Sequence, residues 1–315
     1  MRLNPLLVTA FLLGIVSLQS ARAQNHIRVA SWNLELLTSQ PWVELHKGVG
    51  VKRSLSDFSE YKAIARRLAP DVLVMQELGG ADVPENIFGT NEWRYFVSTN
   101  GNRQPRGVVP GLYVGIGIAK RSGLEVLEAE EITSMSGMAE DGSVIRSGLA
   151  VRLASQGQRL TVVAIHLRAG CEDNISVDKS RTVDCKALWT QVSALNKWIK
   201  MELNRVPIVL VAGDFNRYLQ KKRRNGADQI LDKLTADIST SSATLFPQWS
   251  KTDCPTRQRA NNEPIDFFLL FSRQPETGLS TYQEYTYDPA ALHDGIRLSN
   301  HCPILATLNI PLTRR

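Results

Sequence analysis

The 315-residue sequence lacks several features that would define other classes of protein. It has no internal repeat, no low-complexity block and no flexible linker, which argues against a repeat protein and against domains joined by a tether. After residue 23 no segment is apolar enough to span a bilayer, and no Cys-x-x-Cys or His-x-x-x-His spacing supports a zinc site. With 43% hydrophobic residues, the chain can build one large domain or two small ones.

The first residues have the layout of a secretory signal peptide. Arg2 precedes a mostly apolar stretch over 5–18, and Ala21-Arg22-Ala23 provides a small-x-small cleavage site. A membrane anchor is the alternative, but the stretch is shorter than the roughly 20 residues of a spanning helix. We expect residues 1–23 to be a signal peptide and residues 24–315 to form one domain, secreted or periplasmic.

The four cysteines all follow this segment, and an even number suits disulfides in an oxidising compartment. We favour a pairing of Cys171 with Cys185, because it closes a short polar loop. This leaves Cys254 with Cys302, which would tie a loop beside the last strand. A loop of about 15 residues contributes roughly 3 kcal/mol in the chain-entropy treatment.

Short apolar runs rich in β-branched residues recur along the chain and predict strands. They cover residues 27–34, 71–75, 114–119, 148–153, 160–165, 208–212, 265–271 and 303–310. Helical periodicity appears over 58–68, after a capping box that Ser54 and Asp57 can form, and over 188–203 and 230–234. Because strands outnumber helices and several follow one another directly, we expect packed sheets with helices outside.

The strand candidate at 208–212 ends in Gly213-Asp214-Phe215-Asn216. Side chains alternate along a strand, so Asp214 and Asn216 should point the same way, toward a site that handles water and phosphate. An Asx turn that closes the strand is the alternative, because Gly, Asp and Asn are ordinary turn residues. The other strand ends decide between these interpretations.

Polar residues that suit phosphoryl transfer stand at those strand ends. They are Asn33, Glu77, His166, Asp266, Asn300 and His301. Carboxylate and amide oxygens are the hard ligands that Mg²⁺ prefers. Histidines can donate hydrogen bonds to a phosphoryl oxygen or protonate a leaving group, and carboxylates can orient a histidine or deprotonate water. Each residue alone is more often a cap or turn group, but the set fits the needs of phosphoryl transfer.

The ordered motifs resemble those of the endonuclease/exonuclease/phosphatase superfamily, which includes DNase I-like nucleases, neutral sphingomyelinases and inositol-polyphosphate phosphatases. The motifs are Ser31-Trp32-Asn33, Gln76-Glu77, Ile165-His166-Leu167, Gly213-Asp214-Phe215-Asn216, Ile265-Asp266-Phe267 and Ser299-Asn300-His301. The resemblance runs from about Ile27 to Ile310. It implies an α/β (α+β) four-layer sandwich in which two mainly antiparallel sheets pack face to face between helices.

The resemblance also implies a metal site. Glu77, helped by Asn33, would hold a catalytic Mg²⁺ or Mn²⁺, Asp214 would orient or deprotonate the attacking water, and Asn216 would contact the scissile phosphate. The superfamily usually has Ser-Asp-His where this chain has Ser-Asn-His. Asn300 would therefore place an amide where a carboxylate is expected near the metal, and we expect weaker binding of a second cation.

The two histidines complete the implied machinery. His166 and His301 would stabilise the transition state or protonate the leaving group, and Asp266 would fix the tautomer of His301.

Charge indicates the substrate. The net charge is +6, and the first 23 residues carry Arg2 and Arg22 and no acid, so the remainder is near +4. A basic run over 221–224 follows Asn216, and Arg146 and Arg168 could reach phosphates, although such residues are usually solvated surface. We expect a monomeric secreted nuclease that cleaves phosphodiester bonds by metal-assisted in-line attack of water. A sphingomyelinase-like or inositol-phosphatase-like enzyme, and a binding protein that has lost catalysis, are the alternatives.

Overall fold

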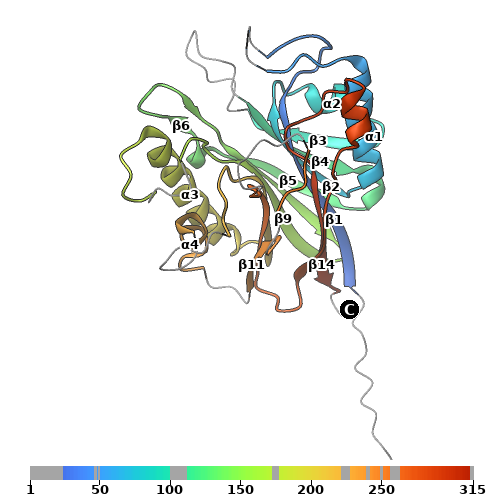
Figure 1. Cartoon of the computed structure of the whole chain (residues 1–315). Coiled ribbons are helices and arrows are strands. Elements are labelled where there is room, and N and C mark those ends of the chain that lie inside the picture. The colour runs from blue at the N-terminus through green and yellow to red at the C-terminus, as the bar shows by residue number, and fades with distance from the viewer. Residues whose placement is uncertain are drawn as a thin grey trace, which may run out of the picture.

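The apolar runs of the sequence form the centres of two six-stranded sheets (Figure 1). The computed structural model describes residues 24–45, 48, 50–99, 112–171, 177–220, 228–238, 242–248, 251–255 and 263–312. The predicted signal peptide, residues 1–23, and the basic run 221–224 lie outside these residues.

The first sheet has the strand order β13-β14-β1-β2-β4-β3. Its strands are β1 (Gln24–Leu37), β2 (Val72–Leu78), β3 (Trp93–Val97), β4 (Tyr113–Ala119), β13 (Gly278–Glu284) and β14 (Ile304–Pro311). The second sheet has the order β11-β12-β10-β9-β8-β5. Its strands are β5 (Glu125–Ile132), β8 (Gly148–Ser155), β9 (Gln158–His166), β10 (Ile208–Asp214), β11 (Ser242–Phe246) and β12 (Asp266–Ser272). A small ribbon pairs β6 (Gly137–Met138) with β7 (Val144–Ile145).

Helices cover the outer face of each sheet (Figure 1). They are α1 (Leu55–Leu68), α2 (Val83–Phe88), α3 (Val183–Glu202), α4 (Gln229–Thr235) and α5 (Pro289–His293), with short 3-10 segments at Lys120–Ser122 and Thr133–Met135. Helix α1 begins with the predicted capping box, because Ser54 Oγ accepts from the Asp57 N–H and the Asp57 carboxylate accepts from the Ser54 N–H. No helix among the described residues is long and apolar enough to cross a membrane.

Alternation along the central strands separates three apolar layers. In β10, Leu210 and Ala212 pack between the sheets, whereas Val209 and Val211 pack under α3 and α4. Strand β1 likewise sends Val29 into the space between the sheets and its other face toward α1. The resulting order of helix, sheet, sheet and helix confirms the predicted four-layer sandwich.

Parallel pairs bring the site strands together within otherwise antiparallel sheets. β1 runs parallel to β2, and β10 runs parallel to β9, so the carboxyl ends of these four strands lie at the same end of the sandwich. The register places Asp214 directly beside His166 on one side and Asp266 on the other. Gly213 permits this close approach, since a Cβ there would lie 2.1 Å from the Ile165 carbonyl oxygen.

The structure also forms two disulfides with the pairing that the sequence favours, Cys171 with Cys185 and Cys254 with Cys302.

Candidate active site

Three polar groups from both sheets converge at the centre of the site. Asn33 lies near the end of β1, Glu77 near the end of β2, and Asp214 at the end of β10. The Asn33 Nδ2 donates to Glu77 Oε1 and to Asp214 Oδ2, each at 3.0 Å. The amide therefore joins two carboxylates that would otherwise repel each other across the gap between the sheets.

The orientation of the Asn33 amide follows from its backbone neighbour. The Glu35 N–H donates to Asn33 Oδ1 at 2.9 Å, and a backbone N–H can bond only the amide oxygen. The oxygen is thus already engaged, and Asn33 contacts Glu77 and Asp214 as a donor. In this structure Asn33 positions the Glu77 and Asp214 carboxylates, and its role beside a metal stays a prediction.

Glu77 is held by a local distortion of its strand. The pairing of β2 shifts register next to it, and Glu77 itself has φ +57, a backbone conformation that is uncommon for a non-glycine residue. Its second carboxylate oxygen accepts from the Leu36 N–H at 3.2 Å. Strain of this kind is typical of positions where the direction of a side chain matters.

His166 is buried between these carboxylates. Its Nε2 lies 3.6 Å from Glu77 Oε1 and 3.7 Å from Asp214 Oδ2, and its Nδ1 is buried without a hydrogen-bond partner. Burial and the nearby charges of Arg146 and His301 hold the pKa of His166 well below its usual range, so the ring is neutral at pH 7. A neutral imidazole has one donor and one acceptor nitrogen, and neither carboxylate is close enough to bond Nε2 directly.

This donor set fits a divalent cation. One ligand atom from each of Glu77, His166 and Asp214 lies within 4.8 Å of the others, which is the spacing that a shared ion requires. Burial and, after it, the charge of Asp266 raise the pKa of Asp214 to about 6, against the opposing charge of His301. A cation between Nε2 and the two carboxylates would relieve the repulsion and give Nε2, which neither carboxylate bonds, a partner.

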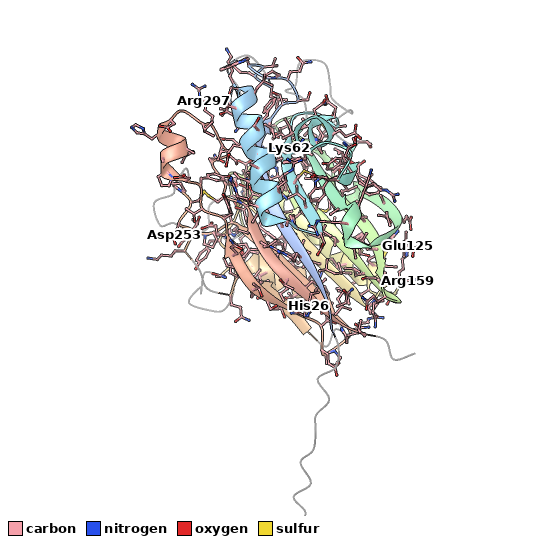
Figure 2. All side chains as sticks on the ribbon, turned by 90° about the vertical axis from the view of Figure 1, so that its right-hand side faces the viewer. His26, Lys62, Glu125, Arg159, Asp253 and Arg297 are labelled. Atoms are coloured by element: carbon pink, nitrogen blue, oxygen red, sulfur yellow. A yellow bond between two sulfur atoms is a disulfide. The ribbon has the colours of Figure 1, made fainter. Side chains whose placement is uncertain are left out.

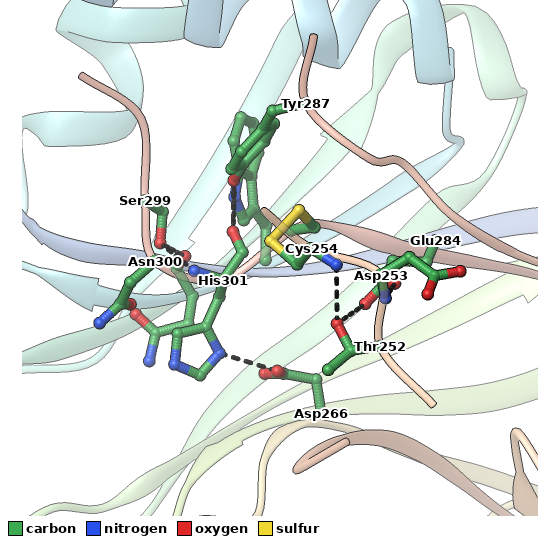
Figure 3. The surroundings of a disulfide bond; sticks show 12 residues. Thr252, Asp253, Cys254, Asp266, Glu284, Tyr287, Ser299, Asn300 and His301 are labelled. Carbon is green, nitrogen blue, oxygen red and sulfur yellow. Dashed lines mark hydrogen bonds and ion pairs between the residues drawn. A yellow bond between two sulfur atoms is a disulfide. The ribbon is translucent and has the colours of Figure 1, made fainter. Parts of the chain in front are cut away.

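His301 and Asp266 form a second group on the other side of Asp214. His301 Nδ1 lies 2.7 Å from Asp266 Oδ2, and His301 Nε2 lies 3.9 Å from Asp214 Oδ2. Since the carboxylate accepts, the proton sits on Nδ1 and leaves Nε2 facing the site. Figure 3 shows the ring turned toward Asp266, and the following residue, Cys302, is joined to Cys254 by the disulfide.

The backbone of His301 is fixed from several directions. Its carbonyl oxygen accepts from Trp32 Nε1 at 3.0 Å and from the Tyr287 hydroxyl, and its N–H donates to Ser299 Oγ at 3.0 Å. The Ser299 hydroxyl in turn donates to the Asn33 carbonyl at 2.6 Å. The two halves of the site are thus joined by Ser299, a residue that sequence reasoning placed in a motif but gave no role.

Asp214 and Asn216 satisfy both interpretations of their motif. Asp214 Oδ1 accepts from the Asn216 N–H at 2.7 Å, which is an Asx turn, while Asp214 Oδ2 faces the site. The Asn216 side chain donates to the Leu167 carbonyl at 2.9 Å, and its second amide hydrogen is left for another acceptor.

Asn300 is exposed, and its backbone N–H donates to Glu35 Oε2 at 3.2 Å. Glu35 is partly buried, it lies near enough to Glu77 and His301 to interact electrostatically, and burial raises its pKa. Buried Arg53 holds it, donating to Glu35 O at 2.8 Å and Glu35 Oε2 at 2.9 Å. Sequence reasoning missed Glu35, although its place two residues after Asn33 on a strand was a usable signal.

The two predicted substrate arginines differ. Arg168 is engaged by acidic neighbours, with its Nε 2.6 Å from Asp184 Oδ1 and a guanidinium nitrogen 3.4 Å from Asp141 Oδ2. Arg146, just after β7, interacts electrostatically with Glu77 and Asp214, and desolvation lowers its pKa. The structure brings Arg146 to the site and holds Arg168 in ion pairs beside it.

A four-layer sandwich with carboxylates and histidines at the shared ends of its central strands defines the endonuclease/exonuclease/phosphatase fold, also called DNase I-like. No protein-family sequence profile matches the chain, and no curated protein sequence does.

Solved structures match over nearly the whole chain. An endonuclease/exonuclease/phosphatase family protein from Bacteroides thetaiotaomicron has a TM-score of 0.59 at 15% identity, covering 91% of this chain and 99% of that one. The human nocturnin catalytic domain with bound sulfate has a TM-score of 0.59 at 11% identity, covering 91% and 97%. A humanized D. rerio TDP2 carrying 14 mutations has a TM-score of 0.52 at 19% identity, covering 90% and 99%. The chain has their fold.

Proposed function

We propose that this chain is a divalent-metal-dependent phosphoester hydrolase, most specifically a nuclease that cleaves phosphodiester bonds. The observation that carries the proposal is the convergence of Glu77, His166 and Asp214 within 4.8 Å of one another at the shared strand ends. The fold supports it, because the strands bring together the motifs on which the sequence resemblance to the endonuclease/exonuclease/phosphatase superfamily rests.

Glu77 is the main carboxylate ligand in this proposal, and Mg²⁺ or Mn²⁺ the cofactor. The bound ion would act as a Lewis acid that neutralises charge on the phosphoryl oxygens. Asn33 keeps the Glu77 and Asp214 carboxylates apart at a fixed spacing. Asn300 contributes no carboxylate, so the proposed mechanism uses one cation. The Glu35 carboxylate accepts from the Asn300 N–H.

Asp214 orients the attacking water and accepts its proton. A carboxyl with a pKa near 6 is a better base than an exposed aspartate and is still mostly ionised at pH 7. His301 presents Nε2 to the phosphoryl group or the leaving oxygen, and Asp266 holds its ring in that orientation. His166 is neutral, and its Nε2 would be the third ligand of the ion beside the two carboxylates, while the second amide hydrogen of Asn216 would contact a phosphate oxygen.

Nucleic acid is the proposed substrate. Arg146 faces the carboxylates of the site and would neutralise a bound phosphate, and the positive net charge favours polyanions in general. Two disulfides suit an oxidising compartment, so we propose that the chain is exported, with residues 1–23 as its signal, and that it acts as a monomer.

The test is hydrolysis of plasmid DNA and of bis-p-nitrophenyl phosphate by the purified protein. We expect turnover with Mg²⁺ or Mn²⁺, loss of turnover with a chelator, and recovery when the ion is added back. An Arg146→Met variant should lose activity on DNA, whereas Lys62→Met, on the outer surface of α1, serves as the matched control. Absence of turnover on every phosphoester tested with either ion would refute the enzyme.

A further inference from the structure

Exposed apolar side chains gather on the loop that leaves the active site. Six large hydrophobic side chains are exposed among the described residues, and three of them lie in or just after the segment that joins β1 to α1. Trp42 is 63% exposed, Val43 42% and Leu55 67%. Scattered exposed apolar residues are ordinary, but a group beside a site indicates a contact surface.

This loop is fastened to the site through one residue. The Trp42 N–H donates to the Arg53 carbonyl at 2.7 Å, and the Arg53 guanidinium donates to the backbone and side chain of Glu35. Glu35 accepts in turn from the Asn300 N–H. The buried residue Arg53 therefore links the Trp42 backbone to Glu35 at the site through its hydrogen bonds.

Trp42 is held in a conformation that packing does not explain. It has φ +64, which is a genuine outlier for a bulky side chain, and the structure records no hydrogen bond or ring contact of its indole among the described residues. The backbone at Trp42 is thus strained while its ring stays exposed.

Cationic groups border the same loop. Arg297 donates from its backbone to Asp57 Oδ1 at 2.8 Å and from its guanidinium to the Lys52 carbonyl at 3.4 Å. Trp42 and Arg297 thus donate to consecutive carbonyls, those of Arg53 and Lys52, and Figure 2 shows Arg297 at the end of α1 that meets this loop.

We propose that Trp42 is a stacking platform for a nucleobase of a single-stranded substrate, with Arg297 contacting the phosphate beside that base. This rests on the proposed nuclease function and names the form of its substrate. Base stacking on an exposed aromatic ring contributes substantially to binding of single strands and tolerates any base. An exposed indole on a loop that Arg297 also contacts supplies this chemistry.

A lipid surface is the competing partner for exposed apolar groups, and the loop suits it less well. Glu44 follows Val43 directly, and its carboxylate is tied to the loop by the Gly48 N–H at 3.0 Å and by Lys52 at 3.7 Å. Insertion of Trp42 and Val43 into a bilayer would carry this carboxylate toward apolar surroundings, which is costly.

The experiment measures binding and turnover separately. A fluorescein-labelled oligothymidylate is titrated with wild type, Trp42→Ala, Trp42→Phe and the matched control Met201→Ala, an exposed apolar residue on α3. Turnover of methyl p-nitrophenyl phosphate by the same proteins reports the catalytic groups alone. We expect Trp42→Ala to weaken oligonucleotide binding about tenfold, Trp42→Phe to keep most of it, and Met201→Ala to keep all. All four proteins should hydrolyse the small ester equally.

Oligonucleotide affinity that is unchanged in Trp42→Ala, or wild type that binds no oligonucleotide, overturns the stacking platform. Binding to phosphatidylcholine vesicles that depends on Trp42, without an effect on oligonucleotides, replaces it with a lipid contact. Absence of small-ester turnover by wild type would instead refute the proposed hydrolase, because that reaction does not involve Trp42.

Discussion

Two buried groups of charged residues in this protein are built in opposite ways. On the outer face of the second sheet, Arg152 binds Glu202 in a bidentate pair of 2.6 and 2.8 Å, and Thr161 donates to the same carboxylate at 2.6 Å. We call this the Arg152 pair. At the strand ends, Glu77, Asp214 and Asp266 bring three carboxylates together with two histidines, one of them neutral and buried.

The difference separates structural charge from functional charge. In the Arg152 pair each carboxylate oxygen has a donor and opposite charges meet, which raises the pKa of the guanidinium through its hydrogen bonds to Glu202. In the site, like charges meet, the Asp214 carboxyl has a raised pKa, and the buried Nδ1 of His166 lacks a hydrogen-bond partner. Such a costly arrangement in a protein interior is typical of sites that hold a ligand or carry out a reaction.

Backbone strain follows the same division. Glu35, Leu36, Glu77 and Asn216 account for four of the nine described non-glycine residues with positive φ, and all four border the site. Arg152, Thr161 and Glu202 have none. Strain is thus concentrated where side chains must be aimed.

The largest effect that would sharpen this comparison is expected for Glu77→Gln. Loss of the carboxylate ligand should lower kcat/KM for phosphoester hydrolysis by about 10³-fold, on the order of 4 kcal/mol of transition-state stabilisation. The melting temperature without metal should stay equal or rise, because one of three mutually repelling carboxylates is neutralised. Steady-state kinetics and thermal unfolding on one preparation check both, with Glu125→Gln, an exposed residue at the start of β5, as the control. Full metal-dependent activity in Glu77→Gln would contradict the ligand assignment.

The reverse pattern is expected at the Arg152 pair. Glu202→Ala leaves a mostly buried guanidinium with only its partly exposed partners Glu128 and Glu130, and should cost about 3 kcal/mol of unfolding free energy. Activity should be unchanged at temperatures where the variant is folded. Urea unfolding measures the loss, and the double variant Arg152→Met with Glu202→Leu should recover most of it. A Glu202→Ala protein as stable as wild type would show that this pair is not structural.

The strands that the sequence predicts are the inner strands of each sheet, and the edge strands were not predicted. All eight predicted strands are present, and they are the four inner strands of each sheet. The edge strands of the two sheets, β3, β5, β11 and β13, were not predicted, and neither was the small ribbon of β6 and β7. An edge strand has one paired neighbour and a partly solvated face, so its apolar pattern is weak, as the four glutamates within Glu125–Ile132 illustrate.

The site shows a similar limit. The residue types and their order along the chain predicted which side chains converge, because strand ends of known direction must meet. The direction of the Asn33 amide depends on the backbone conformation at Glu35, and the capture of Arg168 depends on a contact with Asp184 in another segment, and the residue types alone indicate neither. The same holds for the tie between Glu35 and Arg53.

A third, smaller effect is expected in the pH dependence of stability without metal. The pKa of Asp214 is about 6 in the folded protein against 3.8 ordinarily, so the folded state binds this proton more tightly than the unfolded state. The contribution is therefore present at low pH and is lost as pH rises from about 4 to about 6. Relative to Asp214→Asn, wild type should lose up to about 3 kcal/mol over this range.

Chemical unfolding of both proteins at pH 4.5 and pH 7.5 in chelator measures this difference. Adding Mg²⁺ or Mn²⁺ at pH 7.5 should restore wild type but not Asp214→Asn, because the cation takes the place of the proton. A stability difference between the two proteins that does not change with pH would refute the raised pKa.

The smallest effect is expected at the edge of the site, for Asp266→Asn. Asp266 contacts His301 Nδ1 at 2.7 Å, and its charge acts on Asp214, so its replacement by an amide leaves the Glu77, His166 and Asp214 side chains in place. An amide can accept from Nδ1 but can also donate to it, so it fixes the ring less well, and it lacks the negative charge that supports a ring protonated at both nitrogens and able to donate from Nε2. We expect kcat to fall about 10- to 100-fold with little change in KM, as when other groups that orient a histidine are replaced. The Cys254–Cys302 disulfide and the contacts to the His301 carbonyl hold the backbone independently, so the melting temperature should barely change. An unchanged kcat would mean that something other than Asp266 sets the His301 tautomer. The contact between Asp266 and His301 would then be structural, like the Arg152 pair.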